Sequence, residues 1–290
     1  MNNFLSSDTN HSLHPVGGKG KGLGAMPLTV VKVGGAIVEN EASLNNLLDK
    51  FANIEGLKVL VHGGGRSATK VAEQLGIAQT MIGGRRVTDA ETLKVVTMVY
   101  AGLVNKNIVA QLQARGVNAL GLTGADMNVI VSHKRPLKKV KMEDGTTQEV
   151  DYGFVGDIDL VNADLLSDLI AKGVVPVMSP IGHDTKGSLL NTNADTIAGE
   201  VAKALSKHFE VTLMYCFEKK GVLMNPDDDE SVIPAITAAE FPQLVADGVV
   251  SGGMLPKLEN AFEAISNGVK EVVITQADAI DQPAAGTHLS

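Results

Sequence analysis

Two glycine-rich turns and two lysines carry the clearest chemical signal in this sequence. Gly63–Gly65 follows an apolar run at 57–62 and precedes a helical pattern, and Gly34–Gly35 follows a second apolar run at 29–33. A strand that passes through glycines into a helix leaves unpaired N–H groups at the positive end of the helix dipole, open to an anion. The structural alternative is a tight turn without a ligand, but three successive glycines favour an anion site.

The two lysines stand where a positive charge needs a partner. Lys32 lies inside the first apolar run, and a buried lysine is costly unless its charge is compensated. Lys257 follows Pro256, a residue typical of the first helical turn, where a cation is unfavourable unless an anion is present. The structural alternative for each lysine is a side chain that reaches solvent.

A polar segment at 191–195 and an arginine complete the set. Asn and Asp are common helix caps, but one cap uses one residue, so Asp195 is free to orient lysines or a water on Mg²⁺. Arg86 offers a planar fork for a carboxylate, although a surface arginine is the commoner role. Lysines, glycine turns and one carboxylate suit phosphoryl transfer, which depends on charge neutralisation and positioning. Neither the P-loop motif nor the protein-kinase motifs are present.

Alternating strand and helix patterns must position these residues. They predict an α/β fold with a mainly parallel sheet covered on both faces, and a ligand site beyond the carboxyl ends of its strands. Residues 83–87 read as a loop, and Thr88 reads as the cap of a long helix that runs to Arg115. Alternation on both sides of Asp144-Gly145 predicts a β-hairpin appended to the main sheet.

Composition narrows the class of partner. The net charge of −8, the pI of about 5.4 and an aromatic content of 3% argue against nucleic acid and against an anionic membrane surface. We find no run of about 18 apolar residues, which predicts that no segment spans a membrane. The single cysteine, Cys216, fits a reducing compartment, so we expect a cytoplasmic protein.

Three segments are expected along the chain. Residues 1–25 are glycine- and lysine-rich, which predicts a disordered tail or an expression-vector remnant, with Met26 as the natural start. Residues 26–182 form a first lobe and residues 183–290 a second, with the boundary near 181–184.

Five segments together resemble the N-acetylglutamate kinases of the amino-acid-kinase superfamily, in order and spacing, over roughly residues 27–275. The segments are Lys32-Val33-Gly34-Gly35, Val61-His62-Gly63-Gly64-Gly65, Arg86-Val87-Thr88-Asp89, Asn191-Thr192-Asn193-Ala194-Asp195 and Gly253-Met254-Leu255-Pro256-Lys257. Each motif alone is modest, whereas five in order are specific.

The resemblance implies a three-layer αβα sandwich that uses ATP with Mg²⁺ to phosphorylate the γ-carboxylate of an N-acylated glutamate in arginine biosynthesis. It implies that Lys32 and Lys257 stabilise the transferring phosphoryl group and that Asp195 organises both lysines, with no direct metal ligand. The phosphate-binding residues are then Gly34, Gly35 and Gly253, and the substrate-binding residues are Gly64, Gly65, Arg86 and Asn191. This interpretation requires the two lysines to meet in one cleft.

The resemblance also implies a division of labour and an assembly. The first lobe binds the acyl-amino acid and pairs two copies through the helix after Thr88-Asp89, and the second lobe binds the nucleotide. Related enzymes that arginine inhibits carry an extra N-terminal helix that builds hexamers. Residues 1–25 are too glycine-rich for such a helix, so we expect an arginine-insensitive homodimer.

Some segments depart from the family pattern and leave alternatives open. Cys216–Lys220 replaces the usual Leu-Thr-Asp at the nucleotide edge, Ala125 stands where a lysine is common, and the closing segment 276–290 is short. The motifs do not distinguish an acetyl group from a larger acyl group such as succinyl.

Three rival interpretations remain. One is a related kinase for carbamate, aspartate or glutamate, and another is an inactive ligand-binding regulator on the same fold. The third is a dinucleotide site, because Gly63, Gly65 and Ala68 match G-x-G-x-x-A after a strand, although the acidic residue expected after the next strand is missing.

Overall fold

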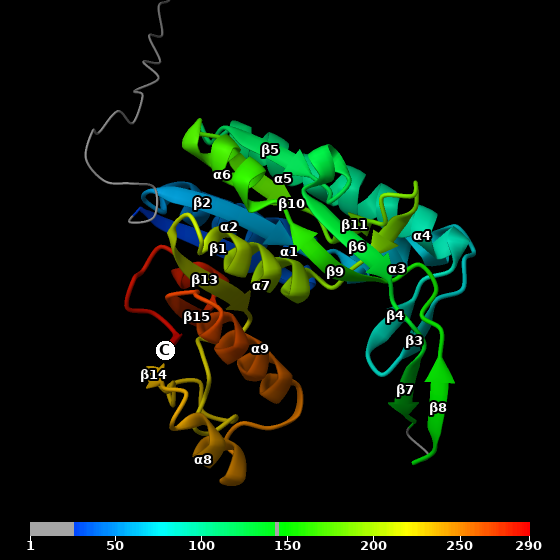
Figure 1. The fold of residues 1–290 in the computed structure, drawn as a ribbon. Helices are drawn as coiled ribbons and strands as arrows, with labels where there is room; N and C mark the ends of the chain where they lie inside the picture. Colours follow the sequence, from blue (N-terminus) through cyan, green and yellow to red (C-terminus); the bar gives the residue numbers. More distant parts are fainter. Residues whose placement is uncertain (1–25, 143–144) are drawn as a thin grey trace, which may run out of the picture.

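The middle layer of the protein is a sheet of eight strands. The computed structural model describes residues 26–142 and 145–290 (Figure 1), so the predicted tail at 1–25 and Asp144 of the predicted hairpin lie outside the described residues. The strand order is β14-β16-β15-β13-β1-β2-β10-β5. In chain order these strands are β1 (Pro27–Val33), β2 (Leu57–His62), β5 (Ala119–Leu122), β10 (Val175–Met178), β13 (Glu210–Phe217), β14 (Ala235–Ile236), β15 (Glu271–Gln276) and β16 (Thr287–Leu289).

All neighbouring strands of this sheet run parallel except β15 and β16, which confirms the prediction of a mainly parallel sheet. β1 lies between β2 and β13, so its carboxyl end is central. Side chains alternate between the two faces of a strand, and Lys32 therefore points to the same face as Leu28 and Val30. That face is the one covered by the helix that carries Asp195.

Helices cover both faces of the sheet and make three layers (Figure 1). One face packs against α6 (Ala163–Ala171), α7 (Ala194–Leu205) and α9 (Leu255–Ser266). The other face packs against α1 (Gly35–Glu39), α2 (Glu41–Asn53), α3 (Gly65–Gln74), α4 (Ala90–Val96) and α5 (Asn105–Gln113). Burial of each leucine or valine side chain stabilises the folded state by about 1.5–3 kcal/mol relative to an exposed side chain. Burial of both sheet faces explains why the central strands read as unbroken valine and leucine runs.

One long helix contains an irregularity that the sequence pattern does not predict. α4 continues without a break into a π-helical segment, η2 (Thr97–Val104), and then into α5. Its cap is Asp89, whose carboxylate accepts a hydrogen bond from the Thr92 N–H over 2.8 Å. The prediction of Thr88 as the cap is wrong, because Thr88 is fully buried and accepts a hydrogen bond from Asn191 instead.

This long helix, Ala90–Gln113, is also long and apolar enough to cross a membrane, judged by length and composition alone. Its residues Val95, Val99, Ile108 and Leu112 are buried in the core beneath the sheet. A core helix of a soluble protein meets the same two criteria, so the absence of a membrane span stays a prediction.

Smaller elements surround the carboxyl end of the sheet. A four-stranded sheet has the order β12-β11-β6-β9 and contains β6 (Ile130–Lys134), β9 (Gly156–Val161), β11 (Ile181–His183) and β12 (Leu189–Asn191). Two hairpins, β3–β4 (Thr80–Ile82, Arg85–Val87) and β7–β8 (Lys138–Lys141, Thr147–Val150), lie side by side (Figure 1) and share a small apolar cluster. The remaining helices in the described part of the chain are α8 (Phe241–Ala246) and the 3-10 turns η3 (Asp126–Asn128), η4 (Gly252–Met254) and η5 (Ala277–Ala279).

Two details of the hairpins correct the sequence analysis. The predicted hairpin forms, but β7 and β8 make a sheet of their own and are not appended to the main sheet. The prediction of a loop at 83–87 is only partly right, because residues 85–87 form strand β4. Gly83 and Gly84, with φ of 56° and 72°, form the tight turn between β3 and β4. Arg86 consequently lies on a strand, which fixes its backbone direction.

Candidate active site

The two predicted glycine turns lie against each other at the carboxyl ends of β1 and β2. The Gly63 N–H donates to the Val33 carbonyl over 3.1 Å, and a Cβ atom on Gly35 would lie 3.8 Å from the Gly65 nitrogen. α1 begins at Gly35 and α3 begins at Gly65. The first turns of two helices are thus neighbours, and their unpaired N–H groups can hold an anion.

Lys32 has the partner that its burial requires. The Lys32 residue is 7% exposed, and its Nζ lies 2.7 Å from Asp195 Oδ1. Asp195 stands in the first turn of α7, where the cap is Asn193: its side-chain oxygen accepts from the Asp195 N–H over 2.7 Å. Because Asn193 caps the helix, the Asp195 carboxylate is left for the lysine.

Lys257 approaches the same place from the first turn of α9. Its Nζ lies 3.8 Å from the centroid of the Phe217 ring, and the Nζ of Lys32 lies 5.6 Å from that centroid. Burial lowers the pKa of Lys257; Asp195 raises it and Lys32 lowers it further. The two lysines therefore interact electrostatically through space.

One cavity of about 480 Å³ is lined by Lys32, Asp195 and Lys257, together with Gly34 and Gly35. The cavity lies at the carboxyl ends of β1 and β13, where a parallel sheet places its ligands. Lys32, Lys257 and Asp195, with two glycine amides, surround one space and form an arrangement that can bind and stabilise a phosphate group. Arg66, Glu218 and Lys219 add further charges to its lining.

A second cavity of about 240 Å³ collects the residues predicted to bind substrate: Gly64, Gly65, Arg86 and Asn191. Gly35 and Gly65 line both cavities, so the two spaces adjoin. The size of the second cavity suits a small molecule, and the guanidinium group of Arg86 suits a carboxylate.

Hydrogen bonds fix the two polar side chains of the second cavity. The Arg86 guanidinium donates to the Gly65 carbonyl over 2.8 Å, to Thr69 Oγ1 over 2.9 Å and to the side chain of Gln79. The Asn191 side-chain amide donates to Thr88 Oγ1 over 3.0 Å. Both groups are therefore held in place without a ligand, which lowers the entropy cost of binding one.

The structure also shows cavity-lining residues that the sequence analysis did not predict, and it leaves one predicted site residue outside both cavities. Arg135 lines the second cavity and pairs with Asp157 over 2.6 Å, and Tyr100 lines it from η2. Phe217 lines the first cavity. Gly253 is exposed in η4 and lines neither cavity, so its predicted contact with phosphate gains no support.

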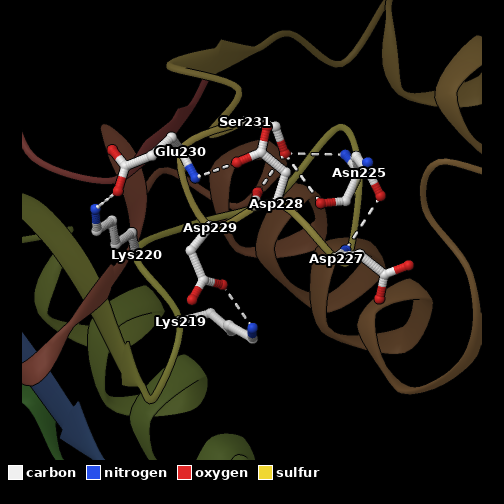
Figure 2. Close-up of polar contacts among 8 residues, drawn as sticks. All are labelled: Lys219, Lys220, Asn225, Asp227, Asp228, Asp229, Glu230 and Ser231. Atoms are coloured by element: carbon white, nitrogen blue, oxygen red, sulfur yellow. Dashed lines mark hydrogen bonds and ion pairs between the residues drawn. The ribbon is translucent and has the colours of Figure 1, made fainter.

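The segment that departs from the family pattern is tied to an acidic loop (Figure 2). Lys219 pairs with Asp229 over 2.6 Å, and Lys220 pairs with Glu230. Within the loop, Ser231 and Asp228 accept hydrogen bonds from the N–H groups of neighbouring residues. The ion pairs are exposed to solvent and screened, so they position the segment weakly.

A buried histidine supports the first glycine of the Gly63–Gly65 turn. His62 is fully buried, and its Nδ1 donates to the Gly63 carbonyl over 2.8 Å while its Nε2 accepts from the Asn105 side-chain amide over 3.0 Å. Asn105 also donates to the Val177 carbonyl over 2.9 Å. This network connects the glycine turn to the long helix and leaves His62 neutral.

We predict a loss of stability at mildly acidic pH that arises from His62. Burial, with a smaller effect of Lys106, lowers the pKa of His62 from 6.5 to about 4, and the Gly63 carbonyl opposes this shift. Between these values the unfolded chain binds a proton that the folded protein excludes, so stability falls as the pH drops. The free energy of unfolding, measured by urea titration, should fall by about 2 kcal/mol from pH 7 to pH 5 from this group alone.

The control for this prediction is a substitution of the histidine itself. His62→Gln removes the titrating group and should flatten the pH dependence, whatever it does to stability at pH 7. An unchanged slope in His62→Gln contradicts the prediction.

Comparison with known proteins identifies the family. The sequence matches the amino acid kinase family over residues 27–276. The chain belongs to this family. Among curated relatives of this amino acid kinase, the acetylglutamate kinase of Bacteroides fragilis is 72% identical over 253 residues, which are 87% of this chain and 93% of the relative.

Solved structures confirm the three-layer fold of this amino acid kinase. The Streptococcus mutans UA159 protein smu.665 is 27% identical with a TM-score of 0.68, and the match covers 91% of this chain and 98% of that chain. Carbamate kinase from Giardia lamblia, solved with AMP-PNP, is 15% identical with a TM-score of 0.63, covers 92% of this chain and 99% of its own, and shows the fold alone.

Proposed function

We propose that this chain transfers the γ-phosphoryl group of ATP to the side-chain carboxylate of N-acetyl-L-glutamate, in arginine biosynthesis. The observation that carries the proposal is the arrangement of Lys32, Asp195 and Lys257 around one cavity beside the glycine turns. The 72% identity to the acetylglutamate kinase of B. fragilis supports N-acetylglutamate as the acceptor.

Phosphoryl transfer requires neutralisation of the charge on the transferring group and alignment of the acceptor with the γ-phosphorus. An oxygen of the acceptor carboxylate attacks the γ-phosphorus, the bond to the bridging oxygen breaks, and ADP leaves with that electron pair. Lys32 and Lys257 stabilise the charge on the transferring group, and Asp195 holds Lys32 in position. The amides of Gly34 and Gly35 lie beside this space and donate to phosphate oxygens.

The acceptor binds in the second cavity. Arg86 and Asn191 hold its α-carboxylate and amide, and the amides of Gly64 and Gly65 face its reacting end. A carboxylate is already ionised at pH 7, so no general base is required. The shared wall of Gly35 and Gly65 brings the acceptor next to the phosphoryl group.

The residues present fit Mg²⁺ that arrives with ATP. Within residues 26–142 and 145–290, no group of three or more His, Cys, Asp or Glu side chains is placed to hold a metal ion. Mg²⁺ keeps water and phosphate ligands and takes few carboxylates. Bound there, the ion would add charge neutralisation, and Asp195, which lines the cavity beside Lys32, would hold one of its waters.

The two lobes divide the substrates in this proposal. Residues 26–182 bind the N-acylglutamate, and residues 183–290 bind ATP. The second cavity is lined mainly from the first range, which supports this division. Asp195, Phe217 and Lys257 of the second range line the phosphoryl cavity, whereas Lys32 comes from the first.

We propose a homodimer that forms through the long helix, in the cytoplasm and without nucleic acid or membrane as a partner. Met98 and Leu103 on η2 are 54% and 63% exposed, and β5 at the edge of the main sheet exposes Leu120. Exposed apolar side chains on adjoining elements are typical of protein interfaces. Sedimentation of a monomer or hexamer, or inhibition by millimolar arginine, contradicts an arginine-insensitive dimer.

The test of the proposed function is ADP release from Mg-ATP with a panel of N-acetylglutamate, glutamate, aspartate and carbamate. We expect turnover with N-acetylglutamate, and hydroxylamine should trap its acyl phosphate as a hydroxamate. Turnover of another panel member alone makes the chain a related kinase. Binding of N-acetylglutamate and ATP without ADP release makes it a regulator.

We predict that Gly64→Ala weakens acceptor binding more than ATP binding. The added Cβ would lie 3.0 Å from Cδ1 and 3.2 Å from Cε1 of Tyr100, so the ring or the turn must shift. We expect KM for N-acetylglutamate to rise about tenfold, as for a displaced binding group, with a smaller change in KM for ATP. Gly102→Ala is the matched control, because Gly102 lies on the same helix as Tyr100 and an added Cβ would meet no atom within 4 Å. Equal effects on both KM values contradict the prediction.

A further inference from the structure

Lys257 lacks the kind of partner that Lys32 has. Among the residues that the structure describes, its ammonium group has no ion pair and no hydrogen bond, although it is about half-buried. Its ammonium group lies over the face of the Phe217 ring, 3.8 Å from the centroid. A cation over an aromatic face at this distance is attracted by the ring quadrupole.

The same ring also lies near the other cation. Lys32 Nζ is 5.6 Å from the Phe217 centroid, and Asp195 already compensates its charge. Two like charges in one cavity repel, which favours a side-chain position of Lys257 that points away. The contact with the ring offsets part of this repulsion and favours the position of the Lys257 ammonium group in the cavity.

Phe217 is itself held firmly. It is the last residue of β13 and pairs in register with Gln276 of β15. Its ring stacks on Tyr215, with centroids 6.2 Å apart and planes inclined by 15°. The Tyr215 hydroxyl donates to the Asp195 carbonyl over 3.4 Å, so the stacked pair is connected to the first turn of α7.

We infer that Phe217 is a positioning residue that holds the ammonium group of Lys257 beside the Lys32–Asp195 pair, where the phosphoryl group transfers. A carboxylate in place of the ring would bind Lys257 strongly and compete with phosphate. The ring stabilises the cation weakly and releases it to a phosphate oxygen, which carries a full charge. The inference rests on the proposed function, because it assigns Lys257 to the transferring group.

The kinetic test compares three substitutions in the full chain. Phe217→Leu keeps an apolar side chain and removes the ring; Phe217→Tyr keeps the ring. Phe262→Leu, on the same helix as Lys257, removes a ring that packs on Phe241 and is the matched control. We expect kcat to fall about tenfold in Phe217→Leu with KM for N-acetylglutamate unchanged, and to stay within about twofold of the unmodified protein in Phe217→Tyr and Phe262→Leu.

The pH profile separates positioning from a structural role. Lys32 and Asp195 act on Lys257 directly, and Arg66, Glu218 and Lys219 line the same cavity. The ring favours the protonated amine, so its removal lowers the pKa of Lys257 further. The alkaline limb of kcat/KM should therefore move to lower pH in Phe217→Leu and in neither of the other variants.

One readout does not depend on turnover. NMR of lysine ¹³Cε atoms follows the titration of Lys257, assigned by its absence from Lys257→Met, and titration with AMP-PNP and Mg²⁺ measures phosphate affinity. A lower Lys257 pKa and weaker AMP-PNP binding in Phe217→Leu support the inference even if N-acetylglutamate is not the acceptor. An unchanged pKa and unchanged binding overturn it, as does a pH profile that Phe217→Leu leaves unmoved. Failure of the unmodified chain to release ADP overturns only the proposed function.

Discussion

Lys257→Ala is expected to lower kcat for ADP release about a thousandfold, with a folded protein and little change in KM for N-acetylglutamate. The substitution removes one of the two ammonium groups proposed to stabilise the charge that develops on the transferring group, and such a loss is about 4 kcal/mol of barrier. Lys257 has no ion pair in the described structure, so its removal leaves no charge unpaired. ADP release slowed about a thousandfold, with a normal unfolding midpoint, is the expected combination.

The matched control is Lys270→Ala. Lys270 is an exposed lysine that pairs with Glu210 at the opposite end of the sheet from the cavity. Its removal should leave kcat unchanged. Turnover by Lys257→Ala at the rate of this control removes Lys257 from the reaction and with it the proposed mechanism.

Asp195→Asn is expected to reduce both stability and activity, for one reason. It leaves the Lys32 ammonium buried without an opposite charge, because Asp195 is the carboxylate 2.7 Å from it. The free energy of unfolding should fall by about 2 kcal/mol, less than for a fully buried pair because the Asp195 side chain is 29% exposed. kcat should fall at least about a hundredfold, since Lys32 loses its fixed position.

A double variant separates these two effects. Lys32→Met with Asp195→Asn removes both charges and should restore most of the lost stability, because the unpaired charge is gone. Its activity should stay low, because the cation is missing. Recovery of activity together with stability contradicts a catalytic role for Lys32.

Much of the fold follows from local sequence pattern. The strands at 29–33 and 57–62 were predictable because they are buried on both faces and therefore read as continuous apolar runs. The cap at Thr88 was predicted wrongly, since the spacing of a capping box says nothing about the distant Asn191 that takes up the Thr88 hydroxyl. The Gly83-Gly84 turn carried a hairpin signal, a glycine pair between two short apolar or basic segments, that the interpretation as a loop overlooked.

The candidate site was predictable where a residue is unusual in its own surroundings. Lys32 in a buried strand demands a partner, and the structure supplies Asp195. Arg135 and Phe217 carry no such signal, because an arginine in a basic segment and a phenylalanine after a strand are ordinary. Their roles follow from contacts between residues that lie apart in the sequence, Arg135 with Tyr152 and Phe217 with Lys257.

The glycine wall common to both cavities has a thermodynamic consequence. Any shift of Gly35 or Gly65 that one ligand induces changes the binding surface of the other ligand, because the same peptide units line both cavities. By reciprocity, the factor by which nucleotide changes acceptor affinity equals the factor by which acceptor changes nucleotide affinity. Dissociation constants measured for either compound alone therefore equal those of the ternary complex only where this factor is one.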